Sequence, residues 1–171
     1  MPVSQELYRG ISGSFPTGVV IVATRGRDGA PKGLTSQTYL GVSTEPPLML
    51  VSLDKTSRTL VALRESEAFV INFLRAGSEA LATVFASKSD NKFAGVRWDA
   101  STQARGAPIL REASVAYAAC LVTQAIEAGD HWLFIASVEA GDVFGGTPLM
   151  YYRRAYAAWP TEHPAPPVED A

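Results

Sequence analysis

Lys55 to Thr59 is the segment of this sequence best equipped to bind an anion. It contains two cations and three hydroxyl side chains, and it stands directly before a helix expected to run to Arg64. Free backbone N–H groups at a helix start, hydroxyl donors and a guanidinium fork together can bind a phosphate group. The same residues also suit a plainer role, in which Thr56 or Ser57 caps the helix and the cations are solvated.

A second polar run, Thr35, Ser36, Gln37 and Thr38, precedes the first and is separated from it by Pro46-Pro47 and an apolar strand at 48–53. Its side-chain and backbone groups can pair with the nitrogen and oxygen atoms along the edge of a planar heterocycle. The alternative is the solvated face of an edge strand. From the residues alone, both interpretations stay open.

Other kinds of chemistry lack their usual signals. The sequence has neither GxGxxG after a strand nor GxxxxGK[ST], the two common nucleotide-phosphate loops, and it has no GxSxG nucleophile elbow. Two histidines and one cysteine, far apart, predict no metal site. Cys120 stands among alanines in a predicted strand, which favours a structural cysteine.

Composition points to one globular domain. The chain has 171 residues, 47% of them hydrophobic and 19% charged, with a net charge of −2, so neither nucleic acid nor an anionic membrane is an expected partner. No apolar stretch is long enough to span a bilayer. A single cysteine excludes an internal disulfide and fits a reducing compartment, which predicts a cytoplasmic protein.

Strands that are joined by hairpins outnumber the helices. Asp28-Gly29 and Gly129-Asp130 are turn signals, and Pro46-Pro47 is expected to end strand pairing because neither nitrogen can donate. An antiparallel barrel with short inserted helices follows. The expected strands are 19–24, 30–40, 48–53, 68–74, 115–123, 131–140 and 149–153, and the expected helices are 4–14, 57–64 and 78–86.

Three further expectations concern particular segments. Leu81, Val84 and Phe85 have the spacing of a core-facing helical stripe, and 99–112 is expected to be a loop. The acidic, proline-rich end, 159–171, predicts a disordered or loosely packed tail. Trp98, Trp132 and Trp159 are expected to be core or interface aromatics.

From Phe15 to Arg153 the sequence resembles the flavin reductase-like proteins that have an FMN-binding split barrel. This group includes the reductase components of two-component flavin-dependent monooxygenases. The matching segments occur in the order of the family: FPTGVVIVAT, DGAPKGLTSQTYLGVSTEPPLMLVSLDKTSRT, FVINFL, LATVFAS, KFAGVRW, GDHWLFIASV and PLMYYRRAY. The ordered set is far more specific than any one segment.

The resemblance implies a mostly β, antiparallel split barrel of Greek-key type over residues 1–158, and an NAD(P)H:flavin oxidoreductase. FMN is the implied flavin, with FAD possible, and NADH or NADPH is the implied hydride donor. A homodimer and a partner monooxygenase that receives reduced flavin are implied as well. Two alternatives stay open: an enzyme with tightly held FMN that reduces another acceptor, and a flavin-binding module without turnover.

The resemblance also assigns residues to the site. His131 would lie near the nicotinamide, although a histidine beside a hairpin turn also suits a plain surface role. The implied flavin-binding residues are Thr35, Ser36, Gln37 and Thr38 beside the ring and ribityl chain, and Ser52, Leu53 and Asp54 along the ribityl chain. At the phosphate they are Thr56, Ser57, Arg58 and Thr59, helped by Ser87, Lys92 and Phe93 from the second helix and its loop, and Tyr152 and Arg153 would close the site near the C-terminal end.

Two positions depart from the usual family pattern. Many relatives have a small residue followed by Asn-Ser-Phe where this chain has Ser36-Gln37-Thr38-Tyr39, and Asp-Pro-Pro where it has Glu45-Pro46-Pro47. The second change keeps the charge and the corner. The first alters the edge that faces the ring, so it bears on flavin preference and on the tightness of binding.

Overall fold

Antiparallel strands form most of the structure, a computed structural model that describes residues 1–160. The main sheet has seven strands in the order β3-β2-β6-β9-β10-β5-β4, and β1-β11-β12 and β7-β8 form two small sheets. The strands are β1 (Thr17–Gly18), β2 (Val20–Arg25), β3 (Pro31–Ser36), β4 (Tyr39–Thr44), β5 (Pro47–Asp54), β6 (Ala68–Leu74), β7 (Asp99–Ala100), β8 (Pro108–Ile109), β9 (Ser114–Ala128), β10 (His131–Val143), β11 (Leu149–Tyr152) and β12 (Ala155–Ala158). The helices are α1 (Gln5–Ser12), α2 (Arg58–Ser66), α3 (Glu79–Ala86) and the short 3₁₀ turn η1 (Arg111–Ala113).

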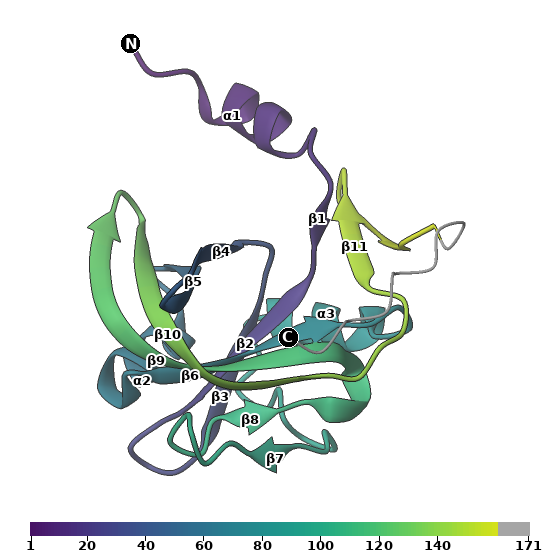
Figure 1. The fold of residues 1–171 in the computed structure, drawn as a ribbon. Coiled ribbons are helices and arrows are strands. Elements are labelled where there is room, and N and C mark those ends of the chain that lie inside the picture. The colour runs from purple at the N-terminus through teal and green to yellow at the C-terminus, as the bar shows by residue number, and fades with distance from the viewer. Residues whose placement is uncertain (161–171) are drawn as a thin grey trace.

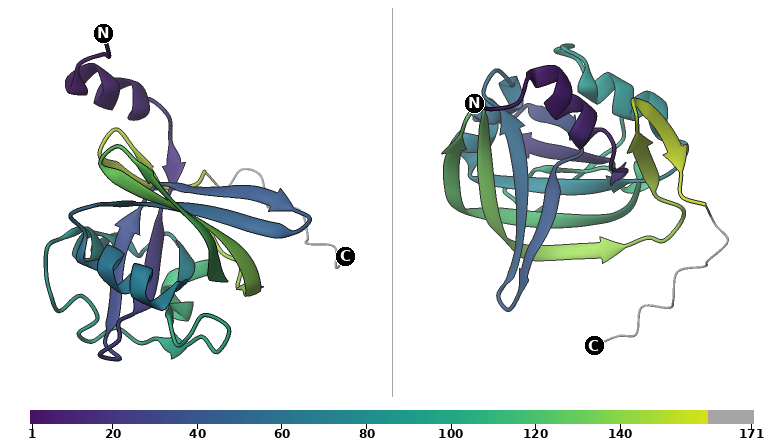
Figure 2. Two further views of the ribbon diagram at one scale, coloured as in Figure 1. Left: turned by 90° about the vertical axis from the view of Figure 1, so that its left-hand side faces the viewer. Right: turned by 90° about the horizontal axis from the view of Figure 1, so that it is seen from above.

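The order of the main sheet separates strands that are neighbours in sequence. β3, β4 and β5 follow one another along the chain, but β3 lies at one edge of the sheet and the β4–β5 hairpin at the other. β5 pairs with β10, where His131 stands opposite Asp54. The long β9–β10 hairpin curves across the molecule (Figure 1), and the β4–β5 hairpin extends to one side of the body (Figure 2). The sheet is therefore a barrel that stays open between its two edge strands, β3 and β4, with β5 next to the second edge.

Two central strands are buried on both faces. Along β2 the residues from Val20 to Thr24 are all buried, and β6 is buried at every position except Phe73. One face of these strands packs into the barrel core against α2, and the other packs against α3 or against the β7–β8 segment. This double burial explains why both strands read as continuous apolar runs rather than alternating ones.

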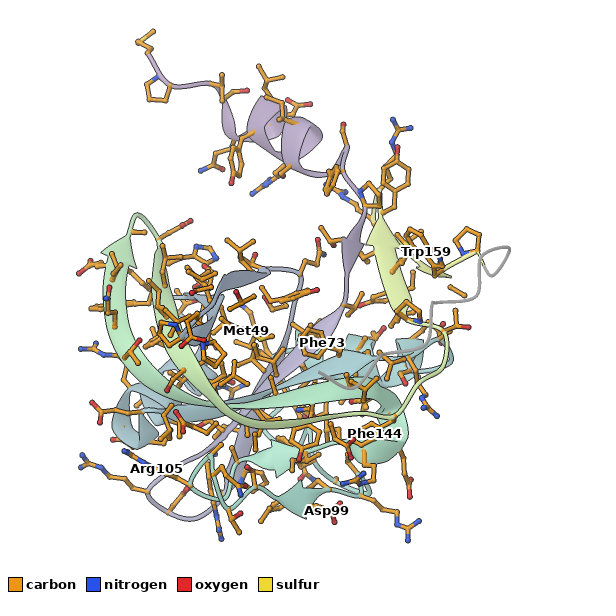
Figure 3. All side chains as sticks on the ribbon, viewed as in Figure 1. Met49, Phe73, Asp99, Arg105, Phe144 and Trp159 are labelled. Carbon is orange, nitrogen blue, oxygen red and sulfur yellow. The ribbon has the colours of Figure 1, made fainter. Side chains whose placement is uncertain are left out.

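The inner side of the curved sheet is filled by aliphatic and aromatic side chains. Met49 and Phe73, labelled in Figure 3, pack against the barrel core, and Phe73 meets the ring of Tyr39 edge-on at 4.9 Å between centroids. Trp98 and Trp132 also pack against core clusters, as predicted. Trp159 lies beyond β12 near the end of the described chain and is half exposed (Figure 3).

Helices α2 and α3 begin at serines, but the two serines act differently. Ser57 caps α2 by accepting a hydrogen bond from the backbone N–H of Thr59 at 3.2 Å. Ser78 precedes α3 without a side-chain cap, and its hydroxyl donates instead to the Ala113 carbonyl at 3.1 Å. It therefore ties the start of α3 to the segment before β9.

The strands predicted at 19–24, 48–53, 68–74, 115–123, 131–140 and 149–153 are present, as are the three helices. The single strand expected at 30–40 is wrong, because the chain breaks at Gln37-Thr38 into β3 and β4. Pro46-Pro47 does not end pairing: Thr44 still pairs with Pro47 across the turn. Pro47 is the first residue of β5, a position where a missing N–H is tolerated.

Other expectations need correction as well. The stripe on α3 is wrong at Val84, which is exposed, since the buried residues are Ala82 and Phe85. The segment 99–112 is not all loop, because β7 and β8 pair there. β12 was not predicted at all. The predicted tail, 159–171, lies outside the described residues from position 161 onward.

Helix α1 stands apart from the rest of the structure (Figures 1 and 2). None of its residues is buried, and its apolar side chains Leu7, Tyr8 and Ile11 are all exposed. Across residues 1–160, no helix has both the length and the apolar character needed to cross a membrane.

Candidate functional site

A cavity of about 780 Å³ opens where the barrel is split, between β3, the end of β5, the start of α2 and the segment after α3. Its volume is within the range of small-molecule sites. Thr35 to Thr38 and Thr56 to Thr59 line it, together with His131, whereas Lys55 lies outside the cavity and pairs with Glu127. The predicted residues on its wall are Thr35, Ser36, Gln37, Thr38, Ser52, Leu53, Asp54, Thr56, Ser57, Arg58, Thr59, Ser87, Lys92, Phe93 and His131.

The turn between β5 and α2 is shaped by Asp54. Its carboxylate accepts hydrogen bonds from both the hydroxyl and the backbone N–H of Thr56, each at 2.6 Å. These bonds, the hydroxyl bond first, hold the pKa of Asp54 below its usual value. With Ser57 serving as the cap, the turn directs the positive end of α2 at the cavity.

Arg58 provides the guanidinium at this end of the cavity. Its Nη1 contacts the carboxylate of Asp90, and its Nη2 donates to the backbone carbonyl of Lys88. Both partners belong to the segment after α3. The family resemblance implied that Ser87, Lys92 and Phe93 of this segment help Arg58 at the phosphate, but it did not point to Lys88 or Asp90. Thr59 lies behind Arg58 and is only 4% exposed.

Lys92 anchors that same segment to the wall of the cavity. Its ammonium group donates to the carbonyl of Phe85 at 2.8 Å and to that of Gly33 at 3.2 Å. Burial lowers the pKa of Lys92, and the nearby charge of Arg58 lowers it further. Phe93 follows directly and packs edge-on against Phe85 with 4.8 Å between ring centroids. This wall of the cavity therefore combines two packed aromatic rings with the ammonium group of Lys92.

The first polar run uses much of its hydrogen-bonding capacity within the protein. Thr35 donates to the Ala82 carbonyl at 2.7 Å and so fastens β3 to α3. The hydroxyl of Ser36 accepts from the N–H of Thr38 at 3.0 Å, which shapes the crossing from β3 to β4. Gln37 accepts from the hydroxyl of Thr17 at 3.4 Å, and this contact links the run to the small sheet that contains β1.

His131 is the first residue of β10 and also lines the cavity. Its Nδ1 is 2.7 Å from a carboxylate oxygen of Asp130, and the hydrogen bond and the charge of His131 lower the pKa of Asp130. On the neighbouring strand β5, the residue paired with His131 is Asp54. Further along β5, Ser52 is half-buried and the side chain of Leu53 lies in the barrel core, which leaves the Leu53 backbone for the cavity.

Tyr152 and Arg153 do not line the cavity, although the sequence resemblance assigned them to it. Tyr151 and Tyr156 line it instead, with their rings edge-on at 5.1 Å between centroids. Successive residues of a strand point to opposite faces, so an assignment one residue out puts the side chain on the wrong face. Leu149 and Tyr151 are two residues apart and pack in the same core cluster. The apolar Leu149 is therefore the signal in the sequence that puts Tyr151, and not Tyr152, on the inward face of the strand.

Sequence reasoning also missed residues that contribute through backbone or packing. Gly33, Phe85, Lys88 and Asp90 all line the cavity. Gly33 has no polar side chain that would mark it in the sequence, but the packing around it favours a glycine, because a Cβ there would come within 2.9 Å of the Phe85 ring. Within residues 1–160, no three histidine, cysteine or acidic side chains gather as a metal site would require.

Comparisons with known proteins decide which family this arrangement belongs to. The flavin reductase like domain matches residues 12–160. The chain belongs to this family. A flavin reductase (NADH) from Kitasatospora aureofaciens is 43% identical over 162 residues, which cover 94% of this chain and 84% of the relative. A flavin reductase (NADPH) from Lentzea aerocolonigenes is 34% identical, with 91% and 90% covered.

A solved structure supports the same conclusion for the fold. A homologue of nitrilotriacetate monooxygenase component B from Mycobacterium thermoresistibile superposes with a TM-score of 0.87 at 32% identity, covering 95% of this chain and 90% of the other. The family, the split-barrel fold and the class of flavin reductase predicted from the sequence are thereby confirmed.

The residues around the cavity fit a flavin phosphate at one end and its ring system at the other. The phosphate end combines a helix start, the guanidinium of Arg58 and the ammonium of Lys92. The other end combines the polar run of β3 with the Tyr151–Tyr156 pair. A dianionic head joined to a flat, hydrogen-bonding ring matches this distribution of donors.

Proposed function

We propose that this flavin reductase binds FMN in the cavity between β3 and β5, with the phosphate at Arg58 and the ring beside residues 35–38. The guanidinium of Arg58 at the start of α2 is the observation that carries the proposal, because it faces the cavity beside hydroxyl and ammonium donors. Bound flavin would supply the chemistry by accepting hydride from NADH or NADPH. The protein itself then needs only to bind, orient and exclude water.

Each wall of the cavity has a task in this proposal. Thr56, Ser57, Arg58 and Thr59, with Ser87 and Lys92, hold the phosphate by charge and hydrogen bonds. Ser52, Leu53 and Asp54 border the chain that joins phosphate to ring. Phe93 supports the flavin from the packed side. Tyr151 and Tyr156, and not Tyr152 and Arg153, close the site near the C-terminal end of the described chain.

His131 is the residue we assign to the nicotinamide. Its imidazole is held by Asp130 through Nδ1, so its other nitrogen is the one directed away from that carboxylate. We expect the variant His131→Ala to raise the KM for NADH or NADPH while the flavin Kd stays the same. Steady-state kinetics and a flavin titration of the same protein separate the two effects. Unchanged KM and kcat would remove His131 from the site.

The variant Arg58→Ala tests the phosphate end directly. A hydrogen bond to a charged group contributes about 1.5–3 kcal/mol, so the Kd for FMN should rise by roughly tenfold to a hundredfold. Riboflavin, which has no phosphate, should bind the variant and the wild type equally well. Quenching of flavin fluorescence on titration measures both constants. Equal losses for both flavins would refute the placement of the phosphate.

Turnover distinguishes the free-flavin reductase from its alternatives. The purified protein is mixed with NADH or NADPH and with FMN, FAD or riboflavin, and nicotinamide oxidation is followed by absorbance. Oxidation that depends on added flavin supports the reductase. Yellow colour retained through gel filtration would indicate a tightly bound flavin instead, and binding without any turnover would indicate a flavin-binding module.

A partner monooxygenase is the proposed receiver of the reduced flavin, in line with the solved homologue of a monooxygenase component. We also propose a cytoplasmic homodimer. The exposed apolar side chains of α1 (Leu7, Tyr8 and Ile11) and of the edge strand β4 (Leu40 and Val42) are surfaces that a second copy would cover. Light scattering behind gel filtration should give twice the chain mass of 18.3 kDa. A monomeric mass at micromolar concentration would contradict the dimer.

A further inference from the structure

The guanidinium of Arg58 is already engaged by oxygen acceptors from the protein itself. One terminal nitrogen contacts the carboxylate of Asp90, and the other donates to the carbonyl of Lys88. A phosphate would offer the same fork two oxygen atoms and a negative charge. The segment after α3 therefore presents to Arg58 an arrangement that resembles the group Arg58 is proposed to bind.

Asp90 is held near Arg58 by a segment that is fastened at both ends. Ser87 donates to the Val84 carbonyl at 2.7 Å where α3 ends, and Lys92 is bound to two carbonyls of the cavity wall. Between these anchors the Asp90 side chain is 85% exposed. Ion pairs between such exposed groups are weak. Asp90 can therefore leave Arg58 for solvent without disturbing the anchored ends of the segment.

We propose that Asp90 competes with the flavin phosphate for Arg58 and so determines how readily the flavin is released. This inference rests on the proposed function, since it assumes that the phosphate binds at Arg58. A phosphate monoester carries a charge of about −1.5 to −2 at neutral pH and would be repelled by a carboxylate at the same guanidinium. Binding of FMN then requires Asp90 to move away, and its return favours dissociation.

The competition gives a physical reason why flavin could dissociate readily from a site that contains several cations. A reductase that delivers reduced flavin to another protein must let it go, and Arg58 and Lys92 together would otherwise oppose release. Asp90 offsets part of their attraction without entering the ring end of the cavity. Its effect is specific for flavins with a phosphate, because riboflavin has no group that contacts Arg58.

The experiment compares wild type, Asp90→Asn and Asp90→Ala with the control Glu112→Gln. Glu112 is an exposed acid paired with Arg97 at 2.8 Å, and neither residue lines the cavity. FMN and riboflavin are titrated into each protein at low and high salt, and FMN dissociation is followed by stopped-flow fluorescence. We expect Asp90→Asn to lower the FMN Kd about two- to tenfold at low salt, chiefly through slower dissociation. Riboflavin binding and the Glu112→Gln protein should match wild type.

Several results would overturn the inference. An unchanged FMN Kd in both Asp90 variants would show that no competition occurs, and a higher one would show that Asp90 instead positions Arg58 for the phosphate. A parallel change for riboflavin would show that the effect does not act through the phosphate. Wild-type protein that binds neither flavin would overturn the proposed function itself, which is a different result from binding that Asp90 does not influence.

Discussion

Gly33 is the position where a single methyl group tests how the cavity wall is built. A Cβ at this residue would lie 2.9 Å from Cε1 of Phe85 and 3.3 Å from Cζ of Phe93, whereas 3.4–4 Å is ordinary contact. Phe85 is fully buried and cannot turn toward solvent, so its ring must shift by about half an ångström and the Phe93 ring by about a tenth of one. The Gly33→Ala variant therefore overpacks the wall on which Phe93 faces the cavity.

The expected cost follows from two opposing effects. Overpacking costs about 1–3 kcal/mol, and the reduced freedom of the unfolded chain returns about 0.4–1 kcal/mol. At the middle of both ranges, Gly33→Ala should be less stable by about 1.3 kcal/mol, which lowers the Tm by roughly 3–5 °C for a domain of this size. Displacement of Phe93 should also weaken binding of both FMN and riboflavin.

Gly41→Ala is the matched control, since a Cβ at Gly41 on β4 has no heavy atom within 4 Å. Calorimetry and flavin titration on the two variants decide the matter. Equal stability and equal flavin affinity would refute the reasoning, because they would show that the Phe85 and Phe93 rings yield at no cost.

Three further predictions concern other parts of the molecule. The side-chain oxygen of the buried Asn72 accepts a hydrogen bond from the Leu110 N–H at 2.7 Å, and the variant Asn72→Leu would leave that donor unpaired. Its free energy of unfolding, measured in urea, should fall by about 1–3 kcal/mol, and a smaller loss would contradict this. Cys120 should resist a thiol reagent at pH 8 until the protein is unfolded, because burial raises the pKa of its thiol to about 12, and fast labelling of folded protein would show otherwise. The pKa of Asp54 is lowered by Thr56, so its stabilising effect is present above the ordinary value of 3.8 and is lost as pH falls through the lowered one. The stability gap between wild type and Asp54→Asn should accordingly shrink in acid, and a gap independent of pH would refute this.

The elements that could be predicted from sequence are those whose signal is local. The β-branched run of β2, the apolar run of β6 and the hydroxyls before α2 each define their element within a few residues. β12 was missed, and β4 was not separated from β3, because both are mostly exposed and lack the continuous apolar run of a buried strand. Pairing with β5 and with β11 forms them, and pairing cannot be read from one segment.

The candidate site shows the same limit at the level of side chains. Thr56 to Thr59 were found because hydroxyls and a cation at a helix start indicate phosphate binding. Thr35 to Thr38 were found as a polar run that can pair with the edge of a planar ring and that the family resemblance places beside the flavin. The contact between Arg58 and Asp90 joins residues far apart in sequence, and no motif announces it. The choice between Tyr151 and Tyr152 depends on which face of β11 meets the cavity, and only the fold decides that.

The open edge of the main sheet has a consequence for how the protein responds to a ligand. β3 and β5 both border the cavity, yet β3 pairs only with β2, and β5 pairs with β10 and β4. A molecule bound to both acts as a cross-link between β3, at one edge of the sheet, and β5, which lies next to the other edge strand, β4. Amide hydrogens on β3 and β5, including those far from any direct contact, should then exchange more slowly in its presence. The ligand would complete, for as long as it stays, a barrel that the chain leaves unclosed.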